Sequence, residues 1–191
     1  MNYQNALDFF SQYSLPSLLI ALTVAIIYFI VDKFLFSKIT FKFKVLVPFF
    51  LGIIFYLLYD VIFVGTKPVF NSGTFSMGFV AGSLSSVMFA VIRRLFSKNG
   101  LKNISLSPIA LLVESIIYPM MEESKLRIAV LAIEKLLTSA FIDFGDEQAV
   151  IDDIAEIINN NSDKELPKSH CEATAKLIVD GTNSLKEGQK H

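Results

Sequence analysis

The sequence predicts an all-α integral membrane protein, in which three transmembrane helices (domain 1–97) precede a C-terminal helical cytoplasmic tail (domain 98–191). Hydrophobic residues make up 53% of the chain and charged residues only 18%, whereas soluble proteins average about 25% charged residues. Sixteen of the eighteen phenylalanines precede residue 97. The first half, residues 1–96, holds seven basic residues against three acidic ones, and the second half holds ten against fifteen. The two halves therefore suit different solvents, lipid for the first and water for the second.

The first span is predicted at about residues 15–36. Ser14 can cap this helix, and Pro16 lies in its first turn, where a missing N–H costs little. Apolar residues then dominate, and the segment reaches the length of about 20 residues that a bilayer requires. The fourteen residues before it contain Asp8 and no Lys or Arg. This composition argues against a cleavable signal peptide, so we expect the first span to stay in the mature protein.

The second span is predicted at about residues 45–64, with Pro48 in its first turn. Asp60 lies near its far end. An ionisable residue at membrane depth is a candidate functional residue by default. Because Asp60 falls within about one turn of the interface, we favour a structural or interfacial role over a pore-lining or proton-handling one.

The third span, at about residues 75–94, carries a ridge of small residues. These residues stand four apart and are Gly78, Gly82, Ser86 and Ala90. The large aliphatic side chains gather on another arc: Met77, Val80, Leu84, Val87, Met88 and Val91. Small residues let helices approach closely in lipid, where the hydrophobic effect does not drive association. The ridge is therefore a helix-packing surface, either for neighbouring spans of the same chain or for self-association.

Basic residues flank the spans unevenly and predict the orientation. They follow the first and third spans as Lys33, Lys38, Lys42, Lys44, Arg93 and Arg94. Only Lys67 follows the second span. Basic residues stay on the cytoplasmic side, so the N-terminus is expected outside and the C-terminus in the cytoplasm, in a multi-pass protein of the cell membrane. These anchors are expected to contact anionic lipid headgroups at about 1 kcal/mol each.

The segment of residues 104–121 is apolar but short, and Glu114 lies at its middle. Ser107 and Pro108 predict a helix start, and Pro119 an end, which gives a helix over about 107–118. A charge at the bilayer centre costs at least a few kcal/mol. We therefore expect this helix to pack under the bundle or lie in the interface. The alternative is a short fourth span over 106–121, which would place the tail outside.

Three amphipathic helices are predicted in the tail, at about 122–142, 146–160 and 169–186. The first carries an apolar stripe of Leu126, Val130, Ile133, Leu137 and Phe141, and Gly145 ends it. The second starts at Asp146 and repeats the pattern through Val150, Ile151, Ile154, Ile157 and Ile158. The third opens with a capping box formed by Ser169 and Glu172.

The residue types needed for catalysis or metal binding are scarce. Cys171 is the one cysteine, and the two histidines are His170 and His191, so neither a disulfide nor a zinc site is supported. The pairs Glu122–Glu123 and Asp152–Asp153 suit solvated helix faces. Phosphate-binding and nucleophile motifs are missing from the sequence. We therefore predict a non-enzymatic protein without cofactors, and the acidic tail argues against nucleic acid as a partner.

The predicted function is that of a helix-bundle membrane anchor whose acidic helical tail binds a cytoplasmic protein partner. Self-association through the third span would make the protein a homo-oligomer. Over residues 1–102, the topology also resembles that of three-span phage holins, with an outside N-terminus, small-residue spans and a charged cytoplasmic end. This resemblance implies an oligomeric, membrane-permeabilising pore. The tail of roughly ninety residues departs from it, because such holins usually carry a short basic tail.

Overall fold

The computed structural model describes residues 9–34, 44, 46–65, 72–96, 107–140, 147–163 and 165–188. These residues form seven α-helices and no strand, which confirms the all-α prediction. The helices are α2 (Leu15–Phe34), α4 (Val47–Tyr59), α5 (Ser72–Phe96), α6 (Pro108–Ile117), α7 (Glu123–Ala140), α8 (Glu147–Asn161) and α9 (Lys168–Gly188). A π-helical turn, Asp60–Val64, extends α4, and a 3-10 turn, Tyr118–Met120, extends α6.

Three N-terminal helices are long and apolar enough to cross a membrane, as the sequence predicts. The apolar segments are Leu15–Asp32, Val47–Val64 and Ser72–Arg94. Even the two shorter ones, at 18 residues each, extend about 27 Å at 1.5 Å per residue, close to the ~30 Å hydrocarbon core of a bilayer. Three candidate spans suggest a multi-pass membrane protein. The Ser14 cap is also confirmed, because its Oγ accepts a hydrogen bond from the Ser17 N–H at 3.4 Å.

The candidate spans alternate in direction. Ile20 clusters with Ala81, and the Tyr28 ring lies 4.6 Å from that of Phe89, so α2 and α5 run parallel. In contrast, α4 runs antiparallel to α5, because its residues Phe49 and Ile53 lie against Gly82 and Gly78 respectively. The C-terminal ends of α2 and α5 therefore lie at the same end of the bundle. Lys44 lies at that end too, since its carbonyl accepts a hydrogen bond from Tyr28.

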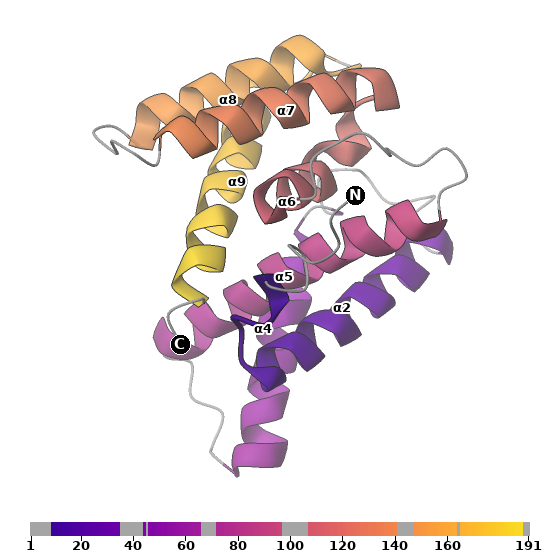
Figure 1. The fold of residues 1–191 in the computed structure, drawn as a ribbon, viewed down its shortest axis with the longest axis vertical. Helices are drawn as coiled ribbons and strands as arrows, with labels where there is room; N and C mark the ends of the chain where they lie inside the picture. Colours follow the sequence, from indigo (N-terminus) through magenta and orange to yellow (C-terminus); the bar gives the residue numbers. More distant parts are fainter. Residues whose placement is uncertain are drawn as a thin grey trace.

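The third candidate span, α5, is the centre of the fold. It contacts α2 and α4 through one part of its surface and α6 and α9 through another (Figure 1). Val80, Leu84 and Val87 of its aliphatic arc are at most 2% exposed and belong to the same apolar cluster as α6. A helix that is apolar on all faces must be buried on all faces. Here protein covers these three residues of the aliphatic arc.

The short apolar helix α6 lies inside the protein. Residues 110 to 117 are all buried, and α6 contacts α5, α7 and α9. Its ten residues extend about 15 Å, half the thickness of the bilayer core. The helix α6 is therefore too short to cross a bilayer. Its contacts support the packed position expected for this segment, and not the short fourth span.

The amphipathic stripes of the tail face the core as predicted. Leu126, Val130, Ile133 and Leu137 of α7 are at most 1% exposed, and Ile154 and Ile158 of α8 are fully buried. Phe141, Gly145 and Asp146 lie outside the described residues. The predicted capping box is wrong, because Ser169 lies within α9. The helix begins at Lys168, and the Pro167 carbonyl accepts hydrogen bonds from the next turn.

One continuous apolar cluster joins the two halves of the chain. It combines Leu84 of α5 with Leu112 of α6, Ile133 of α7 and Ile178 of α9. The Tyr13 hydroxyl also donates a hydrogen bond to the Leu185 carbonyl at 2.5 Å. Figure 1 shows α7 and α8 as a pair at one end of the molecule, with α6 and α9 between this pair and α5. The division into domains at residue 97 stays a prediction about folding units.

The surface has an apolar side and a polar side. The exposed apolar residues of α2 and α4 are Leu15, Leu19, Leu22, Ile26, Ile30, Phe50, Ile54 and Leu58. The π-helical turn adds Ile62 and Phe63, which are 66% and 75% exposed. In contrast, α9 exposes Lys176 and Glu187. Lipid suits the α2 and α4 side, whereas water suits the outer face of α9.

Candidate functional site

A buried carboxylate joins the third candidate span to the tail. Glu114 of α6 is fully buried, and its Oε1 accepts a hydrogen bond from Arg93 Nη2 at 2.8 Å. Its Oε2 accepts one from Arg94 Nε at 2.9 Å and another from Arg94 Nη2. Charged donors satisfy both oxygens, which is the condition under which a buried charge is tolerated.

The start of α6 explains why Glu114 meets the two arginines. Ser107 caps the helix by accepting a hydrogen bond from the Ala110 N–H at 3.1 Å, and Pro108 occupies its first position. This confirms the predicted helix start. The Ser107 hydroxyl also donates to the carboxylate of Glu134 and so ties the cap to α7. Glu114 lies two turns further on, where α6 packs against α5.

An aromatic ring completes one side of the ion pair. The Arg93 guanidinium carbon lies 3.5 Å from the centre of the Tyr118 ring, in the 3-10 turn after α6. A guanidinium over an aromatic face gains roughly 0.5–2 kcal/mol, with the larger values where water is excluded. The Arg93 side chain is 19% exposed and Tyr118 is 37% exposed. This edge of the cluster is therefore the part nearest to solvent.

Arg93, Arg94 and Glu114, with the neighbouring Lys44 and Asp32, form what we call the arginine cluster. It carries more positive than negative charge. Asp32 of α2 lies close enough to Lys44 and Arg93 to interact with both electrostatically. With Arg94 and Glu114, the side chains described at this end comprise three bases and two carboxylates. Nη1 of Arg93 and Nη1 of Arg94 are buried, and neither has a hydrogen-bond partner among the residues that the structure describes.

The predicted cytoplasmic-side anchors lie in different surroundings. Arg93 and Arg94 point onto Glu114, although the sequence led us to expect contact with lipid headgroups. Lys44 lies at the same end of the bundle and is half-buried. Lys38, Lys42 and the side chain of Lys33 lie outside the described residues.

Sequence reasoning missed the ion pair itself. The signal was available, because Glu114 is the lone charge within an apolar run and two adjacent arginines precede it by about twenty residues. A buried acid requires a partner, yet spacing along the chain could not identify which basic residue supplies it. In the sequence alone, Glu114 argues only against a fourth span.

The two glycines of the small-residue ridge lie against α4 of the same chain. A Cβ atom added at Gly82 would lie 2.6 Å from the Phe49 Cα, and one added at Gly78 would lie 2.6 Å from the Ile53 Cα. Ser86 and Ala90 are also buried, at 2% and 1% exposed. These contacts support the interpretation that the ridge packs against a neighbouring span. Self-association through it stays a prediction that no contact within the single chain supports.

Gly52 of α4 lies as close to the α5 backbone as Gly78 and Gly82 of α5 lie to the α4 backbone. A Cβ atom added at Gly52 would lie 2.6 Å from both the Gly78 carbonyl oxygen and the Gly82 nitrogen. Backbone atoms cannot move aside as a flexible side chain can. The α4–α5 crossing therefore requires glycine on both helices.

Asp60 lies where α4 changes into the π-helical turn. It is half-buried, and its carbonyl accepts a hydrogen bond from Gly65, whose φ of 71° ends the helix in the left-handed conformation that glycine favours. Tyr56, one turn earlier, is an electrostatic neighbour of Asp60. The exposed Ile62 and Phe63 follow directly. This position fits the end of a span, as expected for an interfacial residue.

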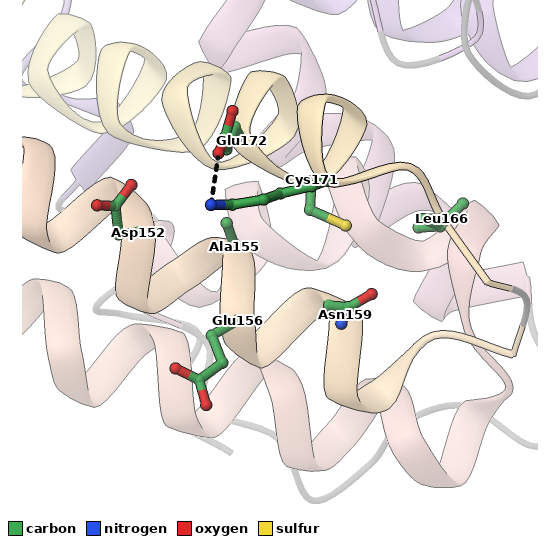
Figure 2. A pocket seen from close by; sticks show the side chains of 8 residues that line it. Asp152, Ala155, Glu156, Asn159, Leu166, Cys171 and Glu172 are labelled. Atoms are coloured by element: carbon green, nitrogen blue, oxygen red, sulfur yellow. Dashed lines mark ion pairs between the residues drawn. The ribbon is translucent and has the colours of Figure 1, made fainter.

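A pocket of about 450 Å³ lies between α8 and α9. Figure 2 shows the residues that line it: Asp152, Ala155, Glu156, Asn159, Leu166, Lys168, Cys171 and Glu172. Lys168 Nζ lies 3.6 Å from Glu172 Oε1. Burial raises the pKa of the Cys171 thiol above its ordinary value, so at neutral pH it stays protonated and is a poor nucleophile. The described residues contain no cluster of three metal-ligating side chains.

The chain matches no known protein family, and no curated protein or solved structure is significantly similar to it.

Proposed function

We propose that the chain is a membrane anchor that holds a helical interaction module, α7 to α9, firmly against its third span. The observation that carries this proposal is the position of α5, which contacts α2 and α4 as well as α6 and α9. A tail attached in this way cannot move freely on a linker. We further propose that the N-terminus lies outside and the tail in the cytoplasm, that the tail binds a protein partner there, and that the chain has no catalytic role.

The distribution of exposed residues supports a one-sided contact with lipid. Leu22 and Ile54, on α2 and α4, are 43% and 50% exposed, and burying an aliphatic side chain of this kind gains about 1.5–3 kcal/mol. On α9, the exposed Lys176 would cost a few kcal/mol in the bilayer centre. Gly181 of that helix lies beside Ser83, near the middle of the third span. We therefore propose that lipid covers α2 and α4, and that water reaches the outer face of α9 along the other side of the third span.

Single cysteines test this assignment. We expect Lys176→Cys in native membranes to react with a maleimide within minutes, whereas Leu22→Cys and Ile54→Cys react only after denaturation, because maleimides require a thiolate in water. The native Cys171 is 1% exposed, and its raised pKa further slows its reaction. The unsubstituted protein therefore gives the background.

The same variants report the orientation of the tail. A membrane-impermeant maleimide should leave Lys176→Cys unlabelled in intact cells and label it once the cells are opened. Labelling in intact cells would place the tail outside. Equal labelling rates for Ile54→Cys and Lys176→Cys in membranes would refute the lipid contact of α4.

Leakage distinguishes the anchor from the permeabilising pore implied by the holin resemblance. Expression of the full chain should leave the membrane potential unchanged, because Gly78 and Gly82 already pack against α4 and cannot serve another copy at the same time. A collapse of the potential on expression of the full chain would favour the pore. A variant ending at residue 97 serves as the comparison, since it exposes the aliphatic arc of α5.

A further inference from the structure

We propose that Nη1 of Arg93 and Nη1 of Arg94 bind a phosphate group, carried by an anionic lipid headgroup or present as free phosphate. This inference extends the arginine cluster beyond its bond to Glu114. If the phosphate belongs to a lipid headgroup, the inference rests on the proposed membrane location. Binding of free phosphate in detergent does not depend on that location.

The first argument is the balance of charge. Two guanidinium groups share the single carboxylate of Glu114, and Asp32 is offset by Lys44. The Arg94 side chain is only 7% exposed, and buried charge requires a counter-charge. The C-terminal end of α5 supplies about half a negative charge. Among the described groups at this end, one positive charge is therefore not fully compensated.

The second argument is the pair of donors without acceptors. Nη1 of Arg93 and Nη1 of Arg94 are buried and unpaired among the described residues. Leaving a buried charged donor without an acceptor costs more free energy than leaving a neutral one unpaired. Such a group is explained by a missing ion or water. Two adjacent guanidinium groups suit a tetrahedral oxyanion, because phosphate can accept from both of them.

The third argument is the place of the cluster. It lies at the C-terminal ends of α2 and α5, which are the ends of two candidate spans, and headgroups lie at this depth in a bilayer. Basic residues at the ends of spans attract anionic headgroups. Neither Nη1 atom reaches solvent, so the phosphate would displace the residues that cover them. Arg93 and Tyr118 form the exposed edge by which it would enter.

Thermal unfolding of the full chain in a non-ionic detergent tests the proposal. Phosphatidylglycerol, inorganic phosphate and the phosphate-free lipid diacylglycerol are added separately. Arg93→Lys and Arg94→Lys keep the positive charge beside Glu114 but remove Nη1. Arg127→Lys makes the same change on an exposed part of α7 and is the matched control. Two site variants are used so that one remains informative should the other fail to fold.

We expect phosphatidylglycerol to raise the unfolding midpoint and diacylglycerol to leave it unchanged. The apparent affinity should fall about tenfold or more in Arg93→Lys and in Arg94→Lys, as for loss of a charge-assisted hydrogen bond, and stay constant in Arg127→Lys. The same pattern with inorganic phosphate alone would assign the site to free phosphate. The proposal is overturned if neither phosphate source raises the midpoint, if diacylglycerol acts equally, or if the site variants respond like the unsubstituted protein.

Discussion

Glu114→Gln is expected to lower the free energy of unfolding by about 3–5 kcal/mol, the usual cost of removing one partner from a buried ion pair. The substitution keeps the size of the side chain but removes its charge. Arg94 would then stay 7% exposed with no carboxylate to accept its two hydrogen bonds. Because α6 carries Glu114 and α5 carries both arginines, the loss should loosen the tail from the third span.

Thermal or denaturant unfolding in detergent measures this effect, and Glu156→Gln on the exposed face of α8 is the control. A second comparison isolates the buried charge. The combined change Arg93→Met, Arg94→Met and Glu114→Leu should cost less than Glu114→Gln alone, since no charge is left without a partner. If Glu114→Gln and Glu156→Gln unfolded at the same midpoint, the ion pair would contribute nothing to the attachment of the tail.

Gly82→Leu is expected to lower the free energy of unfolding by about 1–3 kcal/mol or more, because this is the usual cost of adding atoms to a well-packed interior. The Cβ atom alone would come within 2.6 Å of the Phe49 Cα and 3.1 Å of the Pro48 carbonyl oxygen. Both are backbone atoms, so α4 as a whole would have to move away from α5. The measurement is the unfolding midpoint of the purified protein together with its cross-linking pattern.

Ser76→Leu is the matched control, because it makes a small-to-large change on the same helix at an exposed position. Leu84→Ile, a volume-conserving change at a fully buried position, should cost less than about 1.5 kcal/mol. If the ridge serves one chain, Gly82→Leu should lower monomer stability. A shift from cross-linked oligomer to a monomer of unchanged stability would instead assign the ridge to self-association. Equal stability of Gly82→Leu and Ser76→Leu would contradict both interpretations.

Local features of the sequence were sufficient to predict the helices. Helix start signals at Ser14 and Ser107, the lengths of three apolar runs and the 3.6-residue period of α7 and α8 all depend on neighbouring residues. The prediction failed locally at Ser169, because the helix already begins at Lys168 and the Pro167 carbonyl accepts the first hydrogen bonds. Helix ends are the least certain feature because several nearby groups can satisfy the same N–H donors.

The sequence by itself therefore determined that this protein is helical, that three helices can cross a membrane, and which face of each helix is apolar. Only the tertiary structure decided what covers those faces. Lipid and a protein interior are both apolar, so periodicity could not show that the arc of Val80, Leu84 and Val87 packs against the tail. The same holds for Glu114, because its partners Arg93 and Arg94 lie on another helix and only packing brings them together.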